Sequence, residues 1–210
     1  MGLSAFISKR PAEDMGQRLI FLFIFLLSEF QVLLCCDCFP SHIQTDFCAS
    51  SFVIKAKVHQ QEELLTPDGF DSWLRYRVNI SNVYKGQEMF LLGNRVLIST
   101  PGPAHSCGPQ ELKLDQDYLI SGYKDETALR AAPCAGVKFW KPIYSSLLQN
   151  IDCGCKVFTP RTWTIPIVNP APPKTDETCI APTRGTCSFK SGVCKKDPDG
   201  VCHWNLVEPC

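Results

Sequence analysis

The sequence predicts a mainly β protein, in which a small barrel of five strands with short helices precedes a small unit held by disulfides. Two observations carry this prediction. Between residues 52 and 131, apolar and polar residues alternate in five short segments, as they do in strands that bury one face. From Cys155 onward the alternation is absent, and six cysteines and many prolines punctuate the chain. Such a segment cannot build a large core and depends on disulfides instead.

Residues 1–35 are typical of a secretory leader. Basic residues at positions 9, 10 and 18 precede an apolar run at 19–27, which is short for a bilayer span. A signal anchor is the alternative interpretation. Signal peptidase prefers a small residue before the cut, which favours cleavage after Cys35 and makes Cys36 the first mature residue. Loss of Cys35 would reduce thirteen cysteines to twelve, an even number that can pair completely.

Charge and cysteine content limit the possible partners. The chain carries 21 basic and 21 acidic residues, so it has no basic field for nucleic acid or an anionic membrane. We expect no nucleic-acid partner and no membrane span. A cysteine-rich chain behind a leader fits an oxidising compartment, and we expect secretion to the extracellular space or matrix. Asn79-Ile80-Ser81 is a glycosylation sequon that is in keeping with this compartment.

The elements begin with a short helix. Ser41-x-x-Gln44 resembles a capping box, which predicts a helix that starts at Ser41 and carries Phe47 and Cys48. The first strand is predicted at 52–58, with a buried face formed by Phe52, Ile54, Ala56 and Val58. The polar residues 59–72, which include Pro67-Asp68-Gly69, predict a long connection.

The second strand buries Leu74, Tyr76, Val78 and Ile80, while Arg75, Arg77 and Asn79 point outward, so the sequon would be accessible. Further strands are predicted at 96–100, 118–123 and 127–131. Residues 141–151 predict a helix with an apolar stripe of Ile143, Leu147, Leu148 and Ile151. Five short strands with one or two helices fit a Greek-key barrel of the oligonucleotide/oligosaccharide-binding (OB) type.

Several stretches of the chain together form a recognisable pattern: residues 36–48 (CDCFPSHIQTDFC), 53–58 (VIKAKV), 83–86 (VYKG), 99–101 (STP) with Cys107-Gly108, and Cys153-Gly154-Cys155. These stretches resemble the tissue inhibitors of metalloproteinases, a family whose N-terminal part is an OB-fold-like, netrin-like barrel. The resemblance covers essentially all of residues 36–155, and the combination of stretches is far more specific than any one of them. The implied domains are a leader at 1–35, a netrin-like inhibitory domain at 36–153 and a divergent cysteine-rich domain at 154–210.

The resemblance implies the bridges Cys36–Cys107, Cys38–Cys134 and Cys48–Cys153. Cys194-x7-Cys202-x-Trp204 is similar to the family's pattern near its C-terminal end and suggests a pair Cys155–Cys202. Two closely spaced cysteines that the family carries soon after the position of Cys155 are missing here. The pairing of the remaining cysteines is therefore left open: Cys179, Cys187, Cys194 and Cys210.

The implied activity is inhibition of extracellular zinc metalloproteinases of the matrix or disintegrin type, by a monomer that is not an enzyme and has no cofactor of its own. A free α-amine and the carbonyl oxygen of the same residue can chelate a metal, and Cys36 would present both to the target's catalytic zinc. That zinc keeps one position open for water, which the inhibitor would displace. The implied protease contacts are Cys36, Asp37, Cys38, Phe39, Pro40, His105, Ser106 and Cys107. The family usually carries a small hydroxyl residue at the position of Asp37.

Other interpretations stay open at this point. A netrin-like module that binds matrix or a receptor without inhibiting a protease is the main alternative, and it would tolerate extra residues before Cys36. Cys36-x-Cys38 and Cys153-x-Cys155 could instead be metal ligands. The histidines at 42, 59, 105 and 203 are scattered, which indicates surface or capping roles. No His, carboxylate and nucleophile are spaced in a way that supports catalysis.

Overall fold

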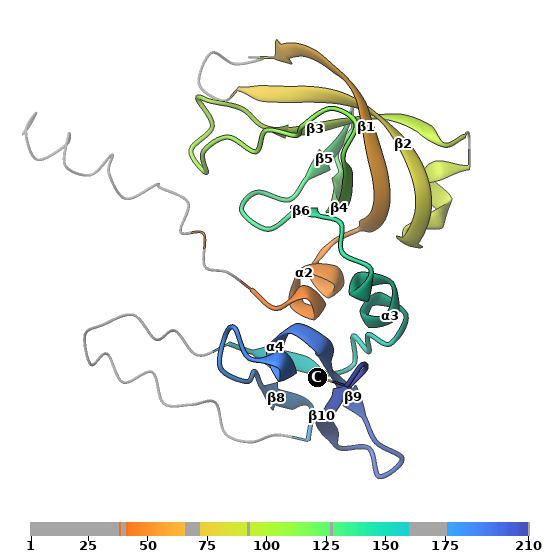
Figure 1. Ribbon diagram of the computed structural model, residues 1–210, viewed down its shortest axis with the longest axis vertical. Helices are drawn as coiled ribbons and strands as arrows, with labels where there is room; N and C mark the ends of the chain where they lie inside the picture. Colours follow the sequence, from red (N-terminus) through yellow and green to blue (C-terminus); the bar gives the residue numbers. More distant parts are fainter. Residues whose placement is uncertain are drawn as a thin grey trace, which may run out of the picture. The chain divides into compact units, whose positions relative to one another are not determined.

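The computed structural model describes residues 38, 41–65, 72–91, 93–126, 128–159 and 176–209 (Figure 1). Residues 37–210 belong to one compact unit. The predicted leader lies outside the described residues, and the division of the mature chain at Cys153 stays a prediction. Among the described residues, no helix is both long enough and apolar enough to cross a membrane.

The chain folds into a β-barrel, which confirms the predicted fold class. Its strands are β1 (Phe52–Leu65), β2 (Trp73–Lys85), β3 (Arg95–Pro101), β4 (Asp117–Lys124), β5 (Leu129–Ala131) and β6 (Val137–Phe139). The sheet order is β1-β2-β3-β5-β4-β6, and β1 also pairs with β4, which closes the barrel. The β3–β5 pair is parallel and the other pairs are antiparallel. Closure leaves few free strand edges, as in other small barrels.

Alternation in the first two strands fills the barrel interior as predicted. All eight residues predicted to face inward from these strands are buried, and Tyr76 and Ile54 are fully enclosed. The Tyr76 hydroxyl still finds a partner, because it accepts a hydrogen bond of 3.2 Å from the backbone N–H of Leu112. A buried tyrosine needs such a partner to offset the loss of water.

One predicted connection is partly wrong. β1 continues past Val58 to Leu65, so residues 59–65 pair with β2 and do not form a loop. Arg77 and Glu62 form a cross-strand ion pair at 2.6 Å. A strand can pair through its backbone whether its side chains are apolar or polar. The alternation pattern detects only strands with one apolar face, so it missed this polar part of β1. Pro67-Asp68-Gly69 lies outside the described residues.

Two short helices pack side by side at one end of the barrel (Figure 1). α2 (Ile43–Ala49) and α3 (Ile143–Gln149) contribute to a second apolar cluster. Val53 and Leu119, which lie on the outward faces of β1 and β4, also belong to it. The predicted stripe of α3 is confirmed, since Leu147 and Leu148 are buried in this cluster. A short 3-10 helix, η2 (Gln87–Phe90), follows β2.

The cap predicted for α2 is wrong by one residue. His42, and not Ser41, is the N-cap, and its Nδ1 accepts a hydrogen bond from the backbone N–H of Gln44. The Ser41 hydroxyl donates to the Asp46 carboxylate instead. The Gln44 side chain does not return to the start of the helix, because it lies among residues of the C-terminal segment.

The C-terminal segment contains short strands and one helical turn that the sequence did not predict. They are β7 (Lys156–Phe158), β8 (Thr178–Ile180), α4 (Cys187–Ser191), β9 (Gly192–Lys196) and β10 (Cys202–Leu206). β7 pairs in parallel with β8, and β9 and β10 form an antiparallel pair. Four buried cysteines form the centre of this segment, with Val157 and Trp204 packed against them. The prediction of a segment held by disulfides is therefore confirmed.

Candidate functional site

One disulfide attaches the segment before α2 to the barrel, and a second attaches α2 to the chain after α3. Cys38 is bonded to Cys134, which lies in the connection between β5 and β6. Cys48, in α2, is bonded to Cys153 beyond α3. Both pairs are those that the family resemblance implied. Cys107 is also disulfide-bonded, but Cys36, its expected partner, lies outside the described residues.

Of the residues expected to contact the target protease, the structure describes Cys38, His105, Ser106 and Cys107. Asp37, Phe39 and Pro40 lie outside the described part of the chain, so their predicted roles stay predictions.

The three residues at 105–107 belong to a tight turn after β3. His105 N–H donates to Gly102 O at 3.1 Å, and Gly108 N–H donates to His105 O at 2.9 Å. Gly108 has a φ of 73°, a conformation that favours glycine. Ala104 and Ser106 are exposed at this turn.

His105 is half-buried and packs against the start of β2. Its imidazole lies edge-on to the indole of Trp73, with 4.8 Å between the ring centroids. Its Nδ1 accepts a hydrogen bond of 3.1 Å from the N–H of Cys107. The prediction that His105 contacts a protease stays untested, and the described geometry gives it a capping role within the turn.

Charged side chains hold α2 at both ends. Lys138 on β6 forms an ion pair of 2.6 Å with Asp46 and donates to the carbonyl of Ala135 in the connection that contains Cys134. Lys85 donates to the carbonyls of Phe47 and Cys48 at 3.0 and 3.1 Å, near the C-terminal end of the helix. A cation at that end satisfies carbonyls that have no partner inside the helix. The helix next to the expected inhibitory segment is therefore fixed on the barrel.

The opposite side of α2 contacts the C-terminal segment through two buried polar residues. His42 lies against the rings of Phe189 and Trp204, at 5.1 and 5.0 Å between centroids. Because its Nδ1 accepts from Gln44 N–H, its Nε2 carries the proton and faces the carbonyl of Phe189 at 3.2 Å. The ring is thus neutral in this arrangement. Burial lowers the pKa of His42 below its ordinary value, and the hydrogen bond to Phe189 opposes part of that effect.

Gln44 makes the most extensive polar contact between these two parts of the chain. Its Nε2 lies 2.9 Å from Asp152 O, 3.2 Å from Cys155 O and 2.7 Å from Cys194 O. Its Oε1 accepts a hydrogen bond of 2.7 Å from Cys194 N–H. Sequence reasoning missed this role, since a polar residue in a short helix carries no signal that names a partner 150 positions away.

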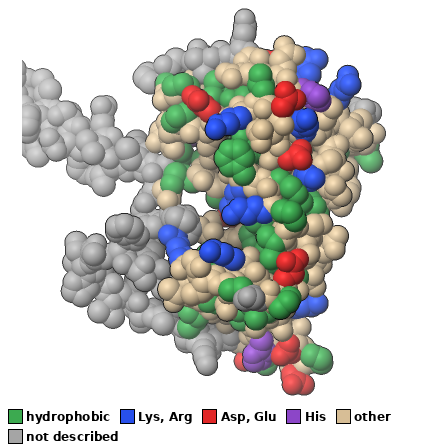
Figure 2. Space-filling model, viewed as in Figure 1, with side chains coloured by type: hydrophobic (Ala, Val, Ile, Leu, Met, Phe, Trp, Pro, Cys, Tyr) green, Lys and Arg blue, Asp and Glu red, His purple; other side chains and the backbone are tan. Residues whose placement is uncertain are grey.

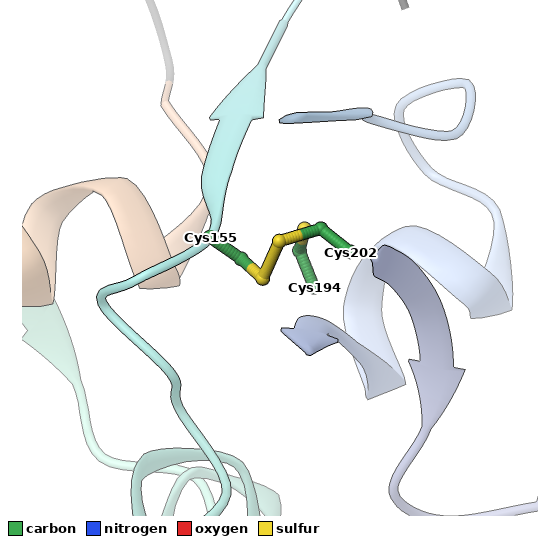
Figure 3. A group of neighbouring side chains, drawn as sticks. All are labelled: Cys155, Cys194 and Cys202. Atoms are coloured by element: carbon green, nitrogen blue, oxygen red, sulfur yellow. A yellow bond between two sulfur atoms is a disulfide. The ribbon is translucent and has the colours of Figure 1, made fainter. Parts of the chain in front are cut away.

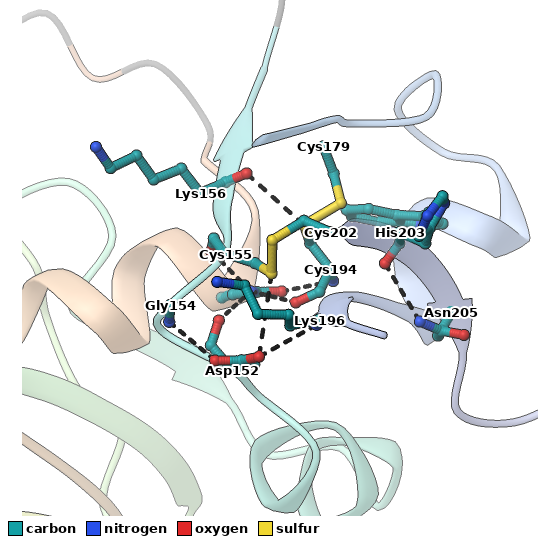
Figure 4. Close-up of a disulfide and its surroundings, with 12 residues drawn as sticks. Asp152, Gly154, Cys155, Lys156, Cys179, Cys194, Lys196, Cys202, His203 and Asn205 are labelled. Carbon is teal, nitrogen blue, oxygen red and sulfur yellow. Dashed lines mark hydrogen bonds between the residues drawn. A yellow bond between two sulfur atoms is a disulfide. The ribbon is translucent and has the colours of Figure 1, made fainter. Parts of the chain in front are cut away.

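Asp152 organises the start of the C-terminal segment (Figure 4). Its carboxylate accepts from the backbone N–H of Gly154 at 2.9 Å and of Lys196 at 3.2 Å. These bonds favour the ionised form and lower the pKa of Asp152 below its ordinary value.

Two adjacent disulfides occupy the middle of the C-terminal segment. The sulfur atoms of Cys155, Cys194 and Cys202 lie within 4.8 Å of one another (Figure 3). Cys155 is bonded to Cys202, as the resemblance suggested, and Cys194 is bonded to Cys179. Zinc binds cysteine as the thiolate, and sulfurs in disulfides do not supply that ligand. Cys38 and Cys153 are likewise bridged, so the alternative that these cysteine pairs ligate a metal does not fit.

The surface has no dominant sign of charge on the face shown in Figure 2. Lys and Arg side chains are interspersed there with Asp, Glu and hydrophobic side chains. Asn79 of the sequon is half-buried on β2, and its Nδ2 lies 2.5 Å from Nε2 of His59. Its glycosylation stays a prediction.

Comparison with known proteins finds a matching family and relatives that align with much of this chain. The family model described as "Tissue inhibitor of metalloproteinase" matches residues 34–204. "Metalloproteinase inhibitor 4" of Mus musculus is 26% identical over 184 residues, which cover 80% of each chain. "Metalloproteinase inhibitor 2" of Gallus gallus is 26% identical over 208 residues and 92% of each chain. "Metalloproteinase inhibitor 3" of Gallus gallus is 30% identical over 128 residues and 58% of each chain.

Proposed function

Because this chain belongs to the tissue inhibitor of metalloproteinase family, we propose that it is a secreted inhibitor of zinc metalloendopeptidases and not an enzyme. The observation that carries the proposal is the family match over residues 34–204, which begins before Cys36 and ends within β10. Relatives that align with most of this chain are named as metalloproteinase inhibitors. We expect the protein to act as a monomer in the extracellular space or matrix.

The inhibitory group, in this proposal, is the main chain of Cys36. Its α-amine has a reference pKa of about 7.7–8.0, so a substantial fraction is unprotonated near neutral pH and can bind a metal. Together with the Cys36 carbonyl oxygen it would chelate the target's catalytic zinc at the position that otherwise holds water. The inhibitor needs no cofactor of its own, because the zinc belongs to the protease.

The arrangement around Cys38 supports this proposal. The Cys38–Cys134 bridge attaches the chain to the barrel only two residues after Cys36, and Cys48–Cys153 attaches the helix that follows. The Lys138–Asp46 ion pair adds a third connection to the same region. A segment that is ordered before binding loses less entropy on association, so more of its contact energy appears as affinity.

The test begins with the N-terminus of the secreted protein. Intact mass should show that the chain starts at Cys36, and the protein should inhibit the catalytic domain of at least one matrix or disintegrin-type metalloproteinase. One alanine added before Cys36 should abolish inhibition, because the Cys36 nitrogen becomes a peptide amide that does not ligate zinc and the extra residue adds bulk. An alanine added after Cys210 is the matched control and should leave inhibition unchanged.

The outcomes separate the hypotheses. Equal inhibition by the N-terminally extended form, with an unchanged circular dichroism spectrum, would rule out chelation by the amine. Absence of inhibition by the protein that starts at Cys36 would favour a netrin-like module that binds matrix or a receptor instead.

A further inference from the structure

We propose that Trp73, the first residue of β2, is a positioning residue for the exposed turn at 103–106, and that it determines inhibitory potency without contacting the protease. This inference rests on the proposed function and adds to it a determinant at the start of β2, outside the barrel core. The evidence lies in the contacts that join the start of β2 to the turn after β3.

The base of the turn is attached to Ser72, the residue before Trp73. Gly102 N–H donates to Ser72 O at 2.8 Å, and Ala104 N–H donates to Ser72 Oγ at 2.7 Å. A Cβ on Gly102 would lie 2.6 Å from Ser72 Oγ, so only glycine allows this approach. Ser72 is almost fully buried, at 1% exposure, which makes it a rigid support.

The indole of Trp73 supports the middle of the turn. His105 packs edge-on against it at 4.8 Å between ring centroids, an arrangement that aromatic rings favour. The guanidinium carbon of Arg130 also lies 4.3 Å from the indole centroid. Arg130 on β5 is itself held in an ion pair with Asp125. Trp73 is 7% exposed, so it is enclosed by these groups.

This arrangement divides the turn into a buried and an exposed part. His105 packs against the start of β2, and Cys107 is fixed by its disulfide. Pro103 and Ala104, before His105, and Ser106, between His105 and Cys107, are exposed. In the proposed complex the exposed residues would meet the protease, and the Trp73–His105 contact would hold them in position. Loss of the indole would leave the His105 imidazole with the hydrogen bond from Cys107 N–H.

The experiment compares Trp73→Leu with Trp73→Phe and with Trp140→Leu as the matched control. Trp140 is a half-buried tryptophan that contacts Tyr84, Tyr144 and Lys55, away from the turn. We expect Trp73→Leu to weaken inhibition of a metalloproteinase catalytic domain by about tenfold or more, since each tenfold corresponds to about 1.4 kcal/mol of binding. Trp73→Phe should retain most of the potency, and Trp140→Leu should change stability with little effect on inhibition.

Amide hydrogen exchange provides the readout that a general loss of stability would not reproduce. Exchange at Ala104, His105 and Cys107 should accelerate in Trp73→Leu, while the amides of β1 and β2 keep their protection. If Trp73→Leu does not fold, His105→Ala removes the same ring contact, and the exchange of Ala104 should rise in the same way. The Cys107 amide is not compared in that variant, because His105→Ala also removes its hydrogen-bond acceptor.

Unchanged inhibition and unchanged turn exchange in folded Trp73→Leu would overturn the inference. Equal loss of inhibition in Trp73→Leu and Trp140→Leu would also overturn it, because the effect would then be one of general stability. If the unmodified protein inhibits no protease, the proposed function fails, but the exchange data still decide whether Trp73 positions the turn.

Discussion

Replacement of Gln44 by alanine should destabilise the protein far more than an ordinary substitution in a seven-residue helix. Gln44 is 1% exposed, and its amide faces three backbone carbonyls and one backbone N–H. The amide nitrogen carries only two protons, so the three carbonyls must share them. Alanine would leave the Cys194 N–H without this acceptor and remove the donors from the Cys194 carbonyl.

The expected magnitude follows from the number of groups that lose partners. A buried polar group without a partner costs about 1–3 kcal/mol, and a lost hydrogen bond costs about 0.5–1.5 kcal/mol net. Water that enters the site would recover part of this cost, so we expect a loss of about 3 kcal/mol in the free energy of unfolding. For a chain of this size, each kcal/mol lowers Tm by roughly 2–4 °C, which gives a decrease of roughly 6–12 °C.

Guanidinium and thermal unfolding under non-reducing conditions would measure this loss. Gln87→Ala is the matched control, because Gln87 is exposed and its Nε2 is 3.5 Å from Val83 O. That variant should change stability by less than about 0.5 kcal/mol. A loss below about 1 kcal/mol for Gln44→Ala, with all disulfides formed, would refute the idea that the Gln44 amide joins α2 to the C-terminal segment.

Three further predictions concern pH, potency and autonomy. The pKa of His42 is lowered in the folded state, so the unfolded chain binds more protons than the folded chain as the pH falls. The contribution of His42 to the free energy of unfolding should be fully present above about pH 6.5 and be lost as the pH falls through the lower folded pKa. Tm at pH 7.5 and 5.5 would measure this loss of stability. The variant His42→Asn, which keeps a capping side chain, should lose less stability between these two pH values. An equal loss in the variant would show that other groups cause the pH dependence. Asp37→Thr should tighten inhibition by at least about tenfold across a panel of matrix metalloproteinases, because it removes a carboxylate that binding would desolvate; no gain with any member would place residue 37 outside the pocket. A chain that ends at Cys153 should fold and inhibit but melt at a lower temperature, since it lacks Val193 and Val207 of the α2–α3 cluster; an unchanged Tm would contradict that packing role.

The barrel and part of the bridge pattern could be predicted because their signals are local or shared with a family. Alternation at Phe52, Ile54, Ala56 and Val58 identifies a buried face without knowledge of its partner, and these residues are enclosed in the structure. The Cys38–Cys134 and Cys48–Cys153 pairs came from the resemblance and not from physical reasoning on spacing. Spacing alone allows many pairings of twelve cysteines.

Other features could not be read from local patterns. β1 continues through polar residues to Leu65 because β2 offers it a partner, although no apolar face marks that extension. His42 was expected as a surface or capping group, and it is a cap that is also buried by Phe189 and Trp204. The short strands after Cys155 form around two disulfides, so their positions depend on bonds and not on periodicity.

By itself, the sequence determined the fold class, the inward face of the first strands, the neutral charge and the likeness to a family of inhibitors. Each of these depends on residue types and on spacing along the chain, which the sequence states directly. Only the tertiary structure decided that Gln44 joins α2 to β9, that Cys179 pairs with Cys194, and that Trp73 supports His105. Those contacts depend on where the folded backbone brings distant segments together, and a one-dimensional pattern contains no measure of that distance.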